Sequence, residues 1–253
     1  MKLYCCQTDI TWEGKAKNYN RVAMLLIATK PERGSLVLLP EMFSTGFSMN
    51  VSGIQDGNGA TAMFLAGMAK EFGVYVIGGV VTAGGDGQGF NQAAVFDPEG
   101  RELTRYTKMQ PFSLGAETKH YHAGKGPMFF QWQDLSVAPF ICYDLRFPEL
   151  FRAAVQKGAQ LFAVIANWPV TRIQHWITLL QARAIENQAY VAGVNRCGTD
   201  PKYTYNGRSI IVDPHGNILA DAGDGERVIS ADIDPTVVVK WREDFPALRD
   251  MRR

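Results

Sequence analysis

Short apolar runs alternate with stretches of helical periodicity along most of the chain. Short apolar or alternating runs predict strands at residues 3–7, 36–39, 74–81, 92–96, 103–106, 137–141, 161–165, 190–195, 209–212 and 227–231. Apolar residues at helical spacing predict helices at 17–28, 60–72, 148–156 and 173–187. Because strands and helices alternate, we predict an α/β fold with the helices outside the sheets.

Two turn segments modify this picture. Asp97-Pro98-Glu99-Gly100 and Asp213-Pro214-His215-Gly216 each lie between two strand-like runs. Asp, Pro and Gly at these spacings favour hairpin turns, so part of the sheet structure should be antiparallel. No linker divides the chain, and we expect one domain over 1–253. The C-terminal tail, 235–253, stays open: its Trp241, Phe245 and Leu248 could dock on a partner subunit or fold back on their own chain.

Each of three predicted strands is followed by one residue whose side chain could take part in a reaction. Cys142 follows the run 137–141, Glu41 follows 36–39, and Lys108 follows 103–106. Acyl transfer from an amide needs a nucleophile, a group that moves its proton, and a donor for the developing oxyanion. Each residue also has an ordinary reading, as a buried cysteine, a helix-start acid and a solvated lysine. A helix start near Pro148 is expected to favour the Cys142 thiolate.

Taken together, the three segments resemble the motifs of the nitrilase or carbon–nitrogen hydrolase superfamily. The similar segments are Leu39-Pro40-Glu41-Met42-Phe43, Tyr106-Thr107-Lys108 and Cys142-Tyr143-Asp144-Leu145-Arg146-Phe147-Pro148-Glu149. The resemblance implies that Glu41 is the general base and acid and that Cys142 attacks the carbonyl carbon to give a thioester. It also implies that Lys108 and the backbone N–H of Tyr143 stabilise the oxyanion. Glu117 matches a second glutamate that orients the site, although an ordinary loop carboxylate is the alternative.

The same resemblance implies the architecture and assembly. Members of this superfamily have a four-layer αββα sandwich and usually pair through their helices into a homodimer. Neither property follows from the periodicity of this sequence.

Three further segments narrow the resemblance to the omega-amidase branch, in particular its bacterial members. They are Ala166-Asn167-Trp168-Pro169, His175-Trp176, and residues 181–193. This branch implies hydrolysis of the terminal amide of 2-oxoglutaramate or 2-oxosuccinamate to the oxo acid and ammonia. The alternatives are deaminated glutathione, N-carbamoyl, nitrile or simple amide substrates. A catalytically silent binding protein of the same fold is a further alternative, but it would predict a broken triad.

A small oxo-dicarboxylic amide requires cationic or N–H donors for its far carboxylate. Arg146, Arg172, Asn167 and the Trp168 N–H lie in or just after the segments expected to line the cleft. Arg146 has a second reading, in which it holds Asp144 or Glu149 and fixes the loop. Trp168 could wall the pocket or simply pack in the core.

Composition and charge exclude several classes of protein. The chain of 253 residues has 46% hydrophobic and 20% charged residues, which is ordinary for a globular protein. A formal net charge of +1 provides no overall field that would attract nucleic acid or an anionic membrane. No apolar run reaches the roughly 18 residues of a membrane helix, and polar Gln7, Thr8 and Asp9 stand where a signal peptide has its apolar core. We expect a cytoplasmic enzyme.

The cysteines and histidines suggest neither disulfides nor a metal. Adjacent Cys5 and Cys6 should point to opposite faces of a strand, and no Cys-x-x-Cys occurs, so we expect reduced thiols. His120 and His122 form a His-x-His without a third ligand at a recognisable spacing. We therefore expect no metal and no cofactor.

Overall fold

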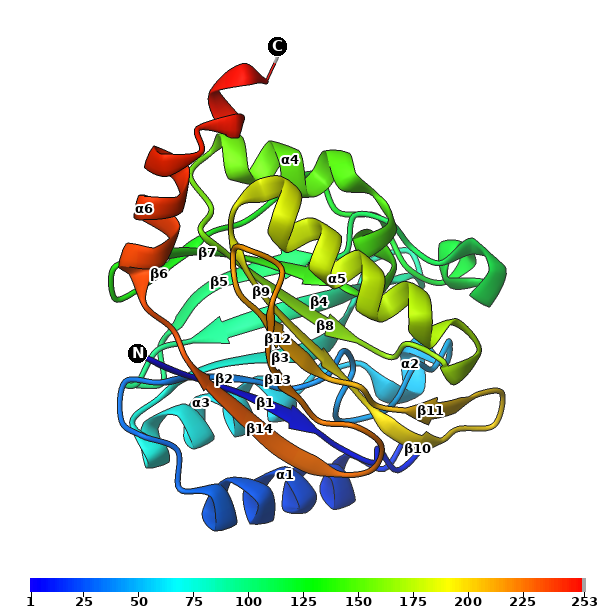
Figure 1. Ribbon diagram of the computed structural model, residues 1–253. Helices are drawn as coiled ribbons and strands as arrows, with labels where there is room; N and C mark the ends of the chain where they lie inside the picture. Colours follow the sequence, from blue (N-terminus) through cyan, green and yellow to red (C-terminus); the bar gives the residue numbers. More distant parts are fainter. Residues whose placement is uncertain (252–253) are drawn as a thin grey trace.

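Two six-stranded sheets form the centre of the molecule in a computed structural model that describes residues 1–251 (Figure 1). The first sheet contains, in spatial order, β14 (Arg227–Asp232), β1 (Lys2–Gln7), β2 (Leu36–Leu38), β3 (Tyr75–Ala83), β4 (Gly89–Phe96) and β5 (Glu102–Thr107). The second contains β13 (Ile218–Asp221), β12 (Ile210–Val212), β9 (Tyr190–Asn195), β8 (Leu161–Ala166), β7 (Leu135–Ile141) and β6 (Phe130–Trp132).

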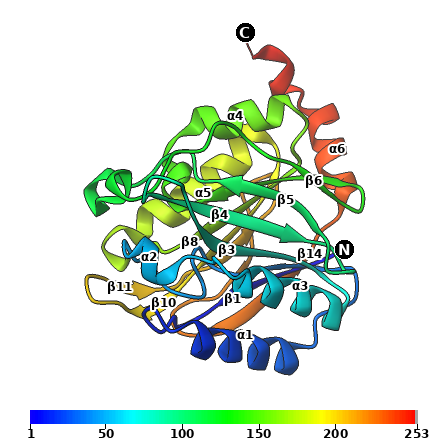
Figure 2. The ribbon, with the colours of Figure 1, turned by 180° about the vertical axis from the view of Figure 1, so that it is seen from behind.

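Helices cover the outer face of each sheet. Helices α1 (Lys15–Thr29) and α3 (Ala60–Phe72) bury Leu26 and Leu65 against the first sheet. Helices α4 (Pro148–Gln156) and α5 (Ile173–Asn187) pack on the second sheet, so the two helical layers lie on opposite sides of the molecule (Figure 2). This arrangement confirms the predicted α/β fold and its four layers, αββα.

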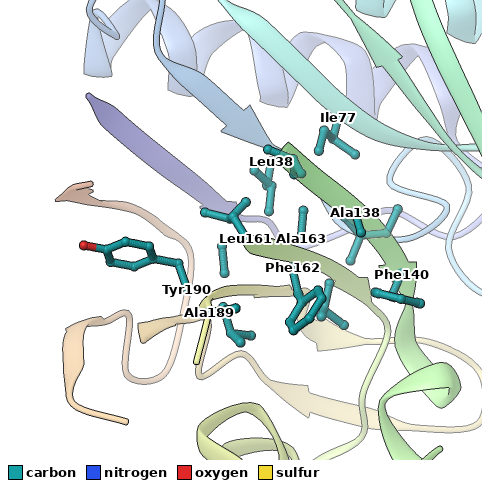
Figure 3. Close-up of a cluster of buried hydrophobic side chains, with 14 of the residues drawn as sticks. Leu38, Ile77, Ala138, Phe140, Leu161, Phe162, Ala163, Ala189 and Tyr190 are labelled. Carbon is teal, nitrogen blue, oxygen red and sulfur yellow. The ribbon is translucent and has the colours of Figure 1, made fainter. Parts of the chain in front are cut away.

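The strands alternate their side chains between two apolar layers, as the two-residue period of a strand requires. In β1, Cys5 lies in the core between the sheets and Cys6 faces α1 and α3, as expected. Leu38 and Ile77 of the first sheet lie near Leu161 of the second (Figure 3). On the outer face of the second sheet, Phe140 stacks on Phe151 of α4 with ring centroids 4.2 Å apart. All four cysteines are free, which agrees with the expected reduced thiols.

Parallel strands at the middle of both sheets bring chain segments to a common site. Strands β1, β2 and β3 are parallel, and so are β7, β8 and β9. Both predicted turns are confirmed, since they join antiparallel β4 to β5 and β12 to β13. Glu41 follows the end of β2, Cys142 follows β7, and Asn167 follows β8. The carboxyl ends of these three strands therefore supply three residues of the candidate site, and Lys108 follows β5.

Several elements were not predicted. They are β6, β13, the four-residue helix α2 (Val51–Ile54), the small hairpin of β10 (Cys197–Thr199) and β11 (Thr204–Asn206), and α6 (Pro235–Asp244). Asp234 caps α6 by accepting a hydrogen bond from Thr236 N, and Pro235 occupies its first turn. None of the described helices combines the length and apolar composition that a membrane span needs.

The described part of the C-terminal tail folds back on its own chain. Val238 is fully buried, and Gln188 Nε2 donates to the Phe245 carbonyl at 2.7 Å. Arg242 Nη2 donates to the Ala159 carbonyl at 2.8 Å. Residues 252 and 253, the end of the predicted 235–253 tail, lie outside the described residues.

Candidate active site

The three residues singled out at strand ends meet around one buried ion pair. Lys108 Nζ lies 2.8 Å from Glu41 Oε1, and both side chains are at most 1% exposed. Lys108 also lines a cavity with Cys142. Buried charges are tolerated only when they are paired and hydrogen-bonded, so a lysine and a glutamate in this position indicate a dedicated site and not a solvated surface.

Glu117 and Asn91 complete the buried charge cluster. Glu117 Oε2 lies 2.9 Å from Lys108 Nζ and accepts a 2.6 Å hydrogen bond from the backbone N–H of Phe112. Asn91 Nδ2 donates to Glu41 Oε1 at 2.7 Å and to Glu117 Oε1 at 2.9 Å. With both carboxylates ionised, the cluster carries one excess negative charge. Burial by itself lowers the pKa of Lys108, but Glu117 and Glu41 together hold that pKa well above its ordinary value.

Asn91 was missed because the strand predicted from the sequence begins at residue 92, one position too late. The observed β4 starts at Gly89 and places Asn91, which is 1% exposed, inside the sheet. A buried amide within an otherwise apolar strand is the signal that could have identified it.

Asn167 holds Glu41 on the side away from Lys108. Its backbone N–H donates to Glu41 Oε2 at 2.9 Å, and its side-chain Nδ2 donates to the Glu41 carbonyl at 2.6 Å. The Asn167 amide was expected to bind substrate. Its N–H group is instead engaged by the glutamate, although the residue does line the cavity.

A glycine in β3 gives the Glu41 segment its position. A Cβ added at Gly79 would lie 2.0 Å from Met42 N and 2.7 Å from the carbonyl carbon of Glu41. Both contacts are to backbone, which cannot move aside like a side-chain tip. Met42 itself has φ of 44°, a left-handed conformation that is unfavourable for a residue with a side chain. The turn at Glu41 is therefore strained and closely supported, as functional turns often are.

Cys142 occupies a second left-handed turn, with φ of 47°. It begins the 3-10 helix Cys142–Arg146, and its Sγ lies 3.7 Å from the Asn167 carbonyl. Helix α4 starts only at Pro148, so Cys142 is not at its N-terminus. Burial, followed by the charge of Glu41, raises the pKa of the Cys142 thiol well above its ordinary value. Burial and the charge of Glu41 thus oppose the thiolate that a helix start was expected to favour.

Asp144 anchors the loop that carries Cys142. Its fully buried carboxylate accepts hydrogen bonds from Tyr106 Oη at 2.7 Å, Gln110 N at 2.8 Å and Ile141 N at 3.0 Å. Burial outweighs these donors and raises the pKa of Asp144 to about 7. Because Tyr106 and Gln110 flank Lys108 in the sequence, Asp144 ties the lysine segment to the cysteine segment.

A small cavity is lined in part by Cys142. Its lining consists of Phe47, Lys108, Phe112, Cys142, Tyr143, Arg146, Asn167, Trp168, Pro169, Arg172, Tyr203 and Tyr205. These described lining residues include three cationic side chains and no carboxylate. Because Lys108 is already paired with Glu41 and Glu117, the two arginines are the charges that suit this aromatic-walled cavity to an anionic ligand. Sequence reasoning missed the two tyrosines of the β10–β11 hairpin, Tyr205 in β11 and Tyr203 in the turn just before that strand.

The two arginines of the cavity have different surroundings. Arg146 lies over the Trp168 ring at 4.9 Å, and its Nη2 is 3.0 Å from His175 Nδ1. Its expected alternative partners were Asp144 and Glu149, but Asp144 points inward to Tyr106. The Arg172 guanidinium lies over the Phe112 ring at 5.6 Å. Neither arginine forms an ion pair with a carboxylate of the described residues.

The Trp168 N–H groups are not free to bind substrate. The indole Nε1 donates to the Arg172 carbonyl at 2.8 Å, and the backbone N–H donates to Asn195 Oδ1 at 2.7 Å. The indole packs against Trp176 at 5.5 Å. Trp168 thus forms part of the cavity wall and fixes the turn that carries Arg172, which corrects the expectation of a donor.

The His-x-His segment lies beside the site without joining it. His122 Nε2 is 3.1 Å from Asp86 Oδ1. Within residues 1–251, no group of three or more His, Cys, Asp or Glu side chains is arranged to hold a metal ion.

Comparison with known proteins identifies the family of the chain. The sequence model of the family described as "Carbon-nitrogen hydrolase" matches residues 2–243. The chain is 34% identical to the 2-oxoglutaramate amidase of Bacillus subtilis, covering 98% of this chain and 96% of that protein. It is 36% identical to the omega-amidase YafV of Yersinia enterocolitica, covering 99% of this chain and 96% of that protein.

Solved structures give the same result. XC1258 from Xanthomonas campestris, a CN-hydrolase superfamily protein with an arsenic adduct in its active site, is 31% identical with a TM-score of 0.93. That match covers 100% of this chain and 97% of the other. A variant of the amidase from Nesterenkonia sp. AN1 carries the acetamide moiety of fluoroacetamide on its active-site cysteine. It is 25% identical with a TM-score of 0.87, over 100% of this chain and 94% of that one.

Proposed function

The chain belongs to the carbon-nitrogen hydrolase family, and from that premise we propose that it is an omega-amidase. Its reaction is hydrolysis of the terminal amide of a small 2-oxo dicarboxylic acid monoamide, 2-oxoglutaramate or 2-oxosuccinamate, to the oxo acid and ammonia. One observation carries the proposal: a buried Glu41–Lys108 pair lies beside Cys142 at a cavity whose other charged lining residues, among those described, are Arg146 and Arg172. Such a cavity favours an amide that carries negative charge elsewhere in the molecule.

In the acylation half of the proposed reaction, Glu41 accepts the Cys142 proton as the sulfur attacks the amide carbonyl carbon. The new C–S bond places negative charge on the carbonyl oxygen, which Lys108 Nζ and the backbone N–H of Tyr143 stabilise. Glu41 then donates its proton to the amide nitrogen as the C–N bond breaks. Ammonia leaves, and a thioester remains on Cys142.

In the second half, water replaces ammonia. Glu41 removes a proton from the water as its oxygen attacks the thioester carbonyl, and the same two donors stabilise the second oxyanion. When the C–S bond breaks, the sulfur recovers a proton from Glu41 and the oxo acid leaves. Each proton that Glu41 accepts is returned, so the site ends in its starting state. Glu117 and Asn91 support this cycle by fixing Lys108 and Glu41 through the bonds described above.

Recognition of the substrate is assigned to the far side of the cavity. Arg146 and Arg172 bind the carboxylate next to the oxo group, because guanidinium groups match carboxylates in geometry and charge. Asn167 orients Glu41, and Trp168 supports both arginines. A catalytically silent protein of the same fold is disfavoured, because it would keep the cost of burying two carboxylates and a lysine next to a thiol without using them.

The enzyme is further proposed to act as a homodimer paired through its helices. This pairing is what membership of the family implies. Sedimentation analysis of the full chain should give twice the 28.0 kDa of one copy, and a single-copy mass would contradict the proposed pairing.

A substrate panel tests the proposed reaction. Ammonia release is measured with 2-oxoglutaramate, 2-oxosuccinamate, deaminated glutathione, an N-carbamoyl amino acid and a simple nitrile. The proposal expects one of the two oxo acid amides to have the highest kcat/KM of the panel. It should exceed that of the nitrile, which lacks a carboxylate, by at least about tenfold, since a guanidinium–carboxylate contact contributes about 1.5–3 kcal/mol. A preference for deaminated glutathione or the nitrile would overturn the substrate while leaving the reaction type intact.

A further inference from the structure

His175 makes a contact that the proposed reaction does not yet use. It lies in the first turn of α5, and its Nδ1 is 3.0 Å from Arg146 Nη2. A guanidinium can only donate hydrogen bonds, so Nδ1 must accept and the imidazole proton must lie on Nε2. The contact therefore has a fixed direction, from the cavity arginine to a neutral histidine on the neighbouring helix.

The position of His175 is set by a buried neighbour. The next residue, Trp176, is fully buried and donates from Nε1 to the Arg208 carbonyl at 2.8 Å. This anchor fixes the first turn of α5 relative to the sheet. His175, although exposed, consequently presents its acceptor at a defined place beside the cavity.

Arg146 is thereby held between two supports. The Trp168 ring lies against the guanidinium at 4.9 Å, and His175 bonds one of its terminal nitrogens. No carboxylate of the described residues neutralises it. An arginine side chain has several rotatable bonds, and fixing them only when substrate binds would weaken affinity. With the two supports in place, that ordering is complete before the substrate arrives.

We propose that His175 is a positioning residue that orients the Arg146 guanidinium toward the far carboxylate of the substrate and so sets the preference for anionic over neutral amides. This inference rests on the proposed function, because it assigns a selectivity to the same cavity. His175 touches no reacting atom. Its effect should therefore fall on KM for the anionic substrate, with kcat and the hydrolysis of neutral amides preserved.

Two substitutions of His175 distinguish the effect of its hydrogen-bond acceptor from the effect of its side-chain size. In His175→Asn, the amide oxygen lies close to where Nδ1 was and can still accept from Arg146. In His175→Leu, a side chain of similar size has no acceptor. We expect the Leu variant to raise KM for 2-oxoglutaramate about fivefold to tenfold, as expected for the loss of one hydrogen bond to a charged group at a partly exposed site, and the Asn variant to stay within about twofold of wild type. Both should hydrolyse butanamide, which lacks the far carboxylate, like wild type.

The same substitution in an Arg146→Met background distinguishes positioning from a general structural effect. If His175 acts through Arg146, adding His175→Leu to Arg146→Met should change KM no further. The inference is overturned if His175→Leu leaves KM for 2-oxoglutaramate unchanged, if it lowers kcat for both substrates equally, or if the two substitutions are additive. A wild-type enzyme that prefers butanamide would overturn the proposed substrate itself and this inference with it, so the two failures are distinguishable.

Discussion

At the scale of single residues, the site is dominated by an excess of negative charge. Two carboxylates share one ammonium group in a buried cluster, and a thiol lies in the same electrostatic environment. Loss of the thiol proton is unfavourable until substrate is present, because it would add a second negative charge to a cluster that already carries one. The thiol should therefore lose its proton together with attack on the carbonyl, when the developing charge moves to an oxygen near Lys108.

The Glu41 charge can be tested through the reactivity of the thiol. Since Glu41 raises the pKa of Cys142, we expect Glu41→Gln to shift the pH profile of Cys142 alkylation by iodoacetamide to lower pH, while amide hydrolysis is lost. Measuring alkylation rates by mass spectrometry from about pH 6 to 10 checks this. Glu149→Gln, at an exposed carboxylate in the first turn of α4, is the control and should retain the wild-type profile. An unchanged profile in Glu41→Gln would remove Glu41 from the surroundings of the thiol.

The sequence alone could identify site residues that follow predicted strands, but not those that lie inside a strand. Glu41, Lys108 and Cys142 each follow a predicted strand, so their order and spacing are evident from the sequence. Asn91 lies inside a strand, and the side-chain direction that brings it to Glu41 depends on a register that the sequence does not specify. Asp144 belongs to a recognisable motif, but its role depends on donors from a different sheet.

At the scale of elements, β3 supports the backbone of the turn that carries Glu41. Gly79 allows the backbone of Glu41 and Met42 to lie against β3 at a distance that excludes any side chain. A residue with a side chain at position 79 would hold this turn farther from β3. The close approach therefore links the stability of the first sheet to the position of the proposed base.

This link predicts the effect of a single methyl group. Gly79→Ala should destabilise the protein by about 1–3 kcal/mol through overpacking and lower kcat at least about tenfold, because a small displacement of a catalytic group is costly. Urea unfolding and steady-state kinetics measure the two effects. Gly67→Ala, at an exposed helical glycine where a Cβ would meet nothing within 4 Å, should instead stabilise by up to about 1 kcal/mol and leave kcat unchanged. A Gly79→Ala variant with wild-type kcat would contradict the proposed role of β3.

The elements that sequence missed are short or contain residues typical of another structure. Strands β10, β11 and β6 have three residues each, too few to show a period. In α6, consecutive Val237, Val238 and Val239 favour a strand, yet the Asp234 cap and the burial of Val238 select a helix.

At the scale of the whole molecule, the alternation of strands and helices predicted the α/β class, whereas the division into two sheets depended on the family resemblance. A period of two residues tells which side chains share a face, but it does not tell which sheet a strand joins. The contact between the sheets then brings together groups far apart in the chain, such as Tyr106 and Asp144. Global stability should therefore depend on the ionisation of this buried carboxyl.

Because the folded-state pKa of Asp144 is raised to about 7 from 3.8, the folded protein keeps a proton that the unfolded chain has released between these values. The contribution of Asp144 to stability is therefore fully present below about pH 4 and is lost as the pH rises through about 7. Asp144→Asn should lower stability at low pH and flatten this part of the profile, as measured by urea unfolding from about pH 4 to 8. Asp134→Asn, at an exposed aspartate between β6 and β7, is the control. Parallel profiles for wild type and Asp144→Asn would contradict the assignment.

The central claim is that Cys142, Glu41 and Lys108 act on one carbonyl group. The most direct test is intact-mass spectrometry of the enzyme quenched in acid during turnover of 2-oxoglutaramate, followed by peptide mapping. We predict an acyl adduct on Cys142 in the wild type, its absence in Cys142→Ala, and a loss of turnover of at least about 10³-fold in that variant. Amide hydrolysis by Cys142→Ala at a rate comparable to wild type, or an adduct on another residue, would contradict the account.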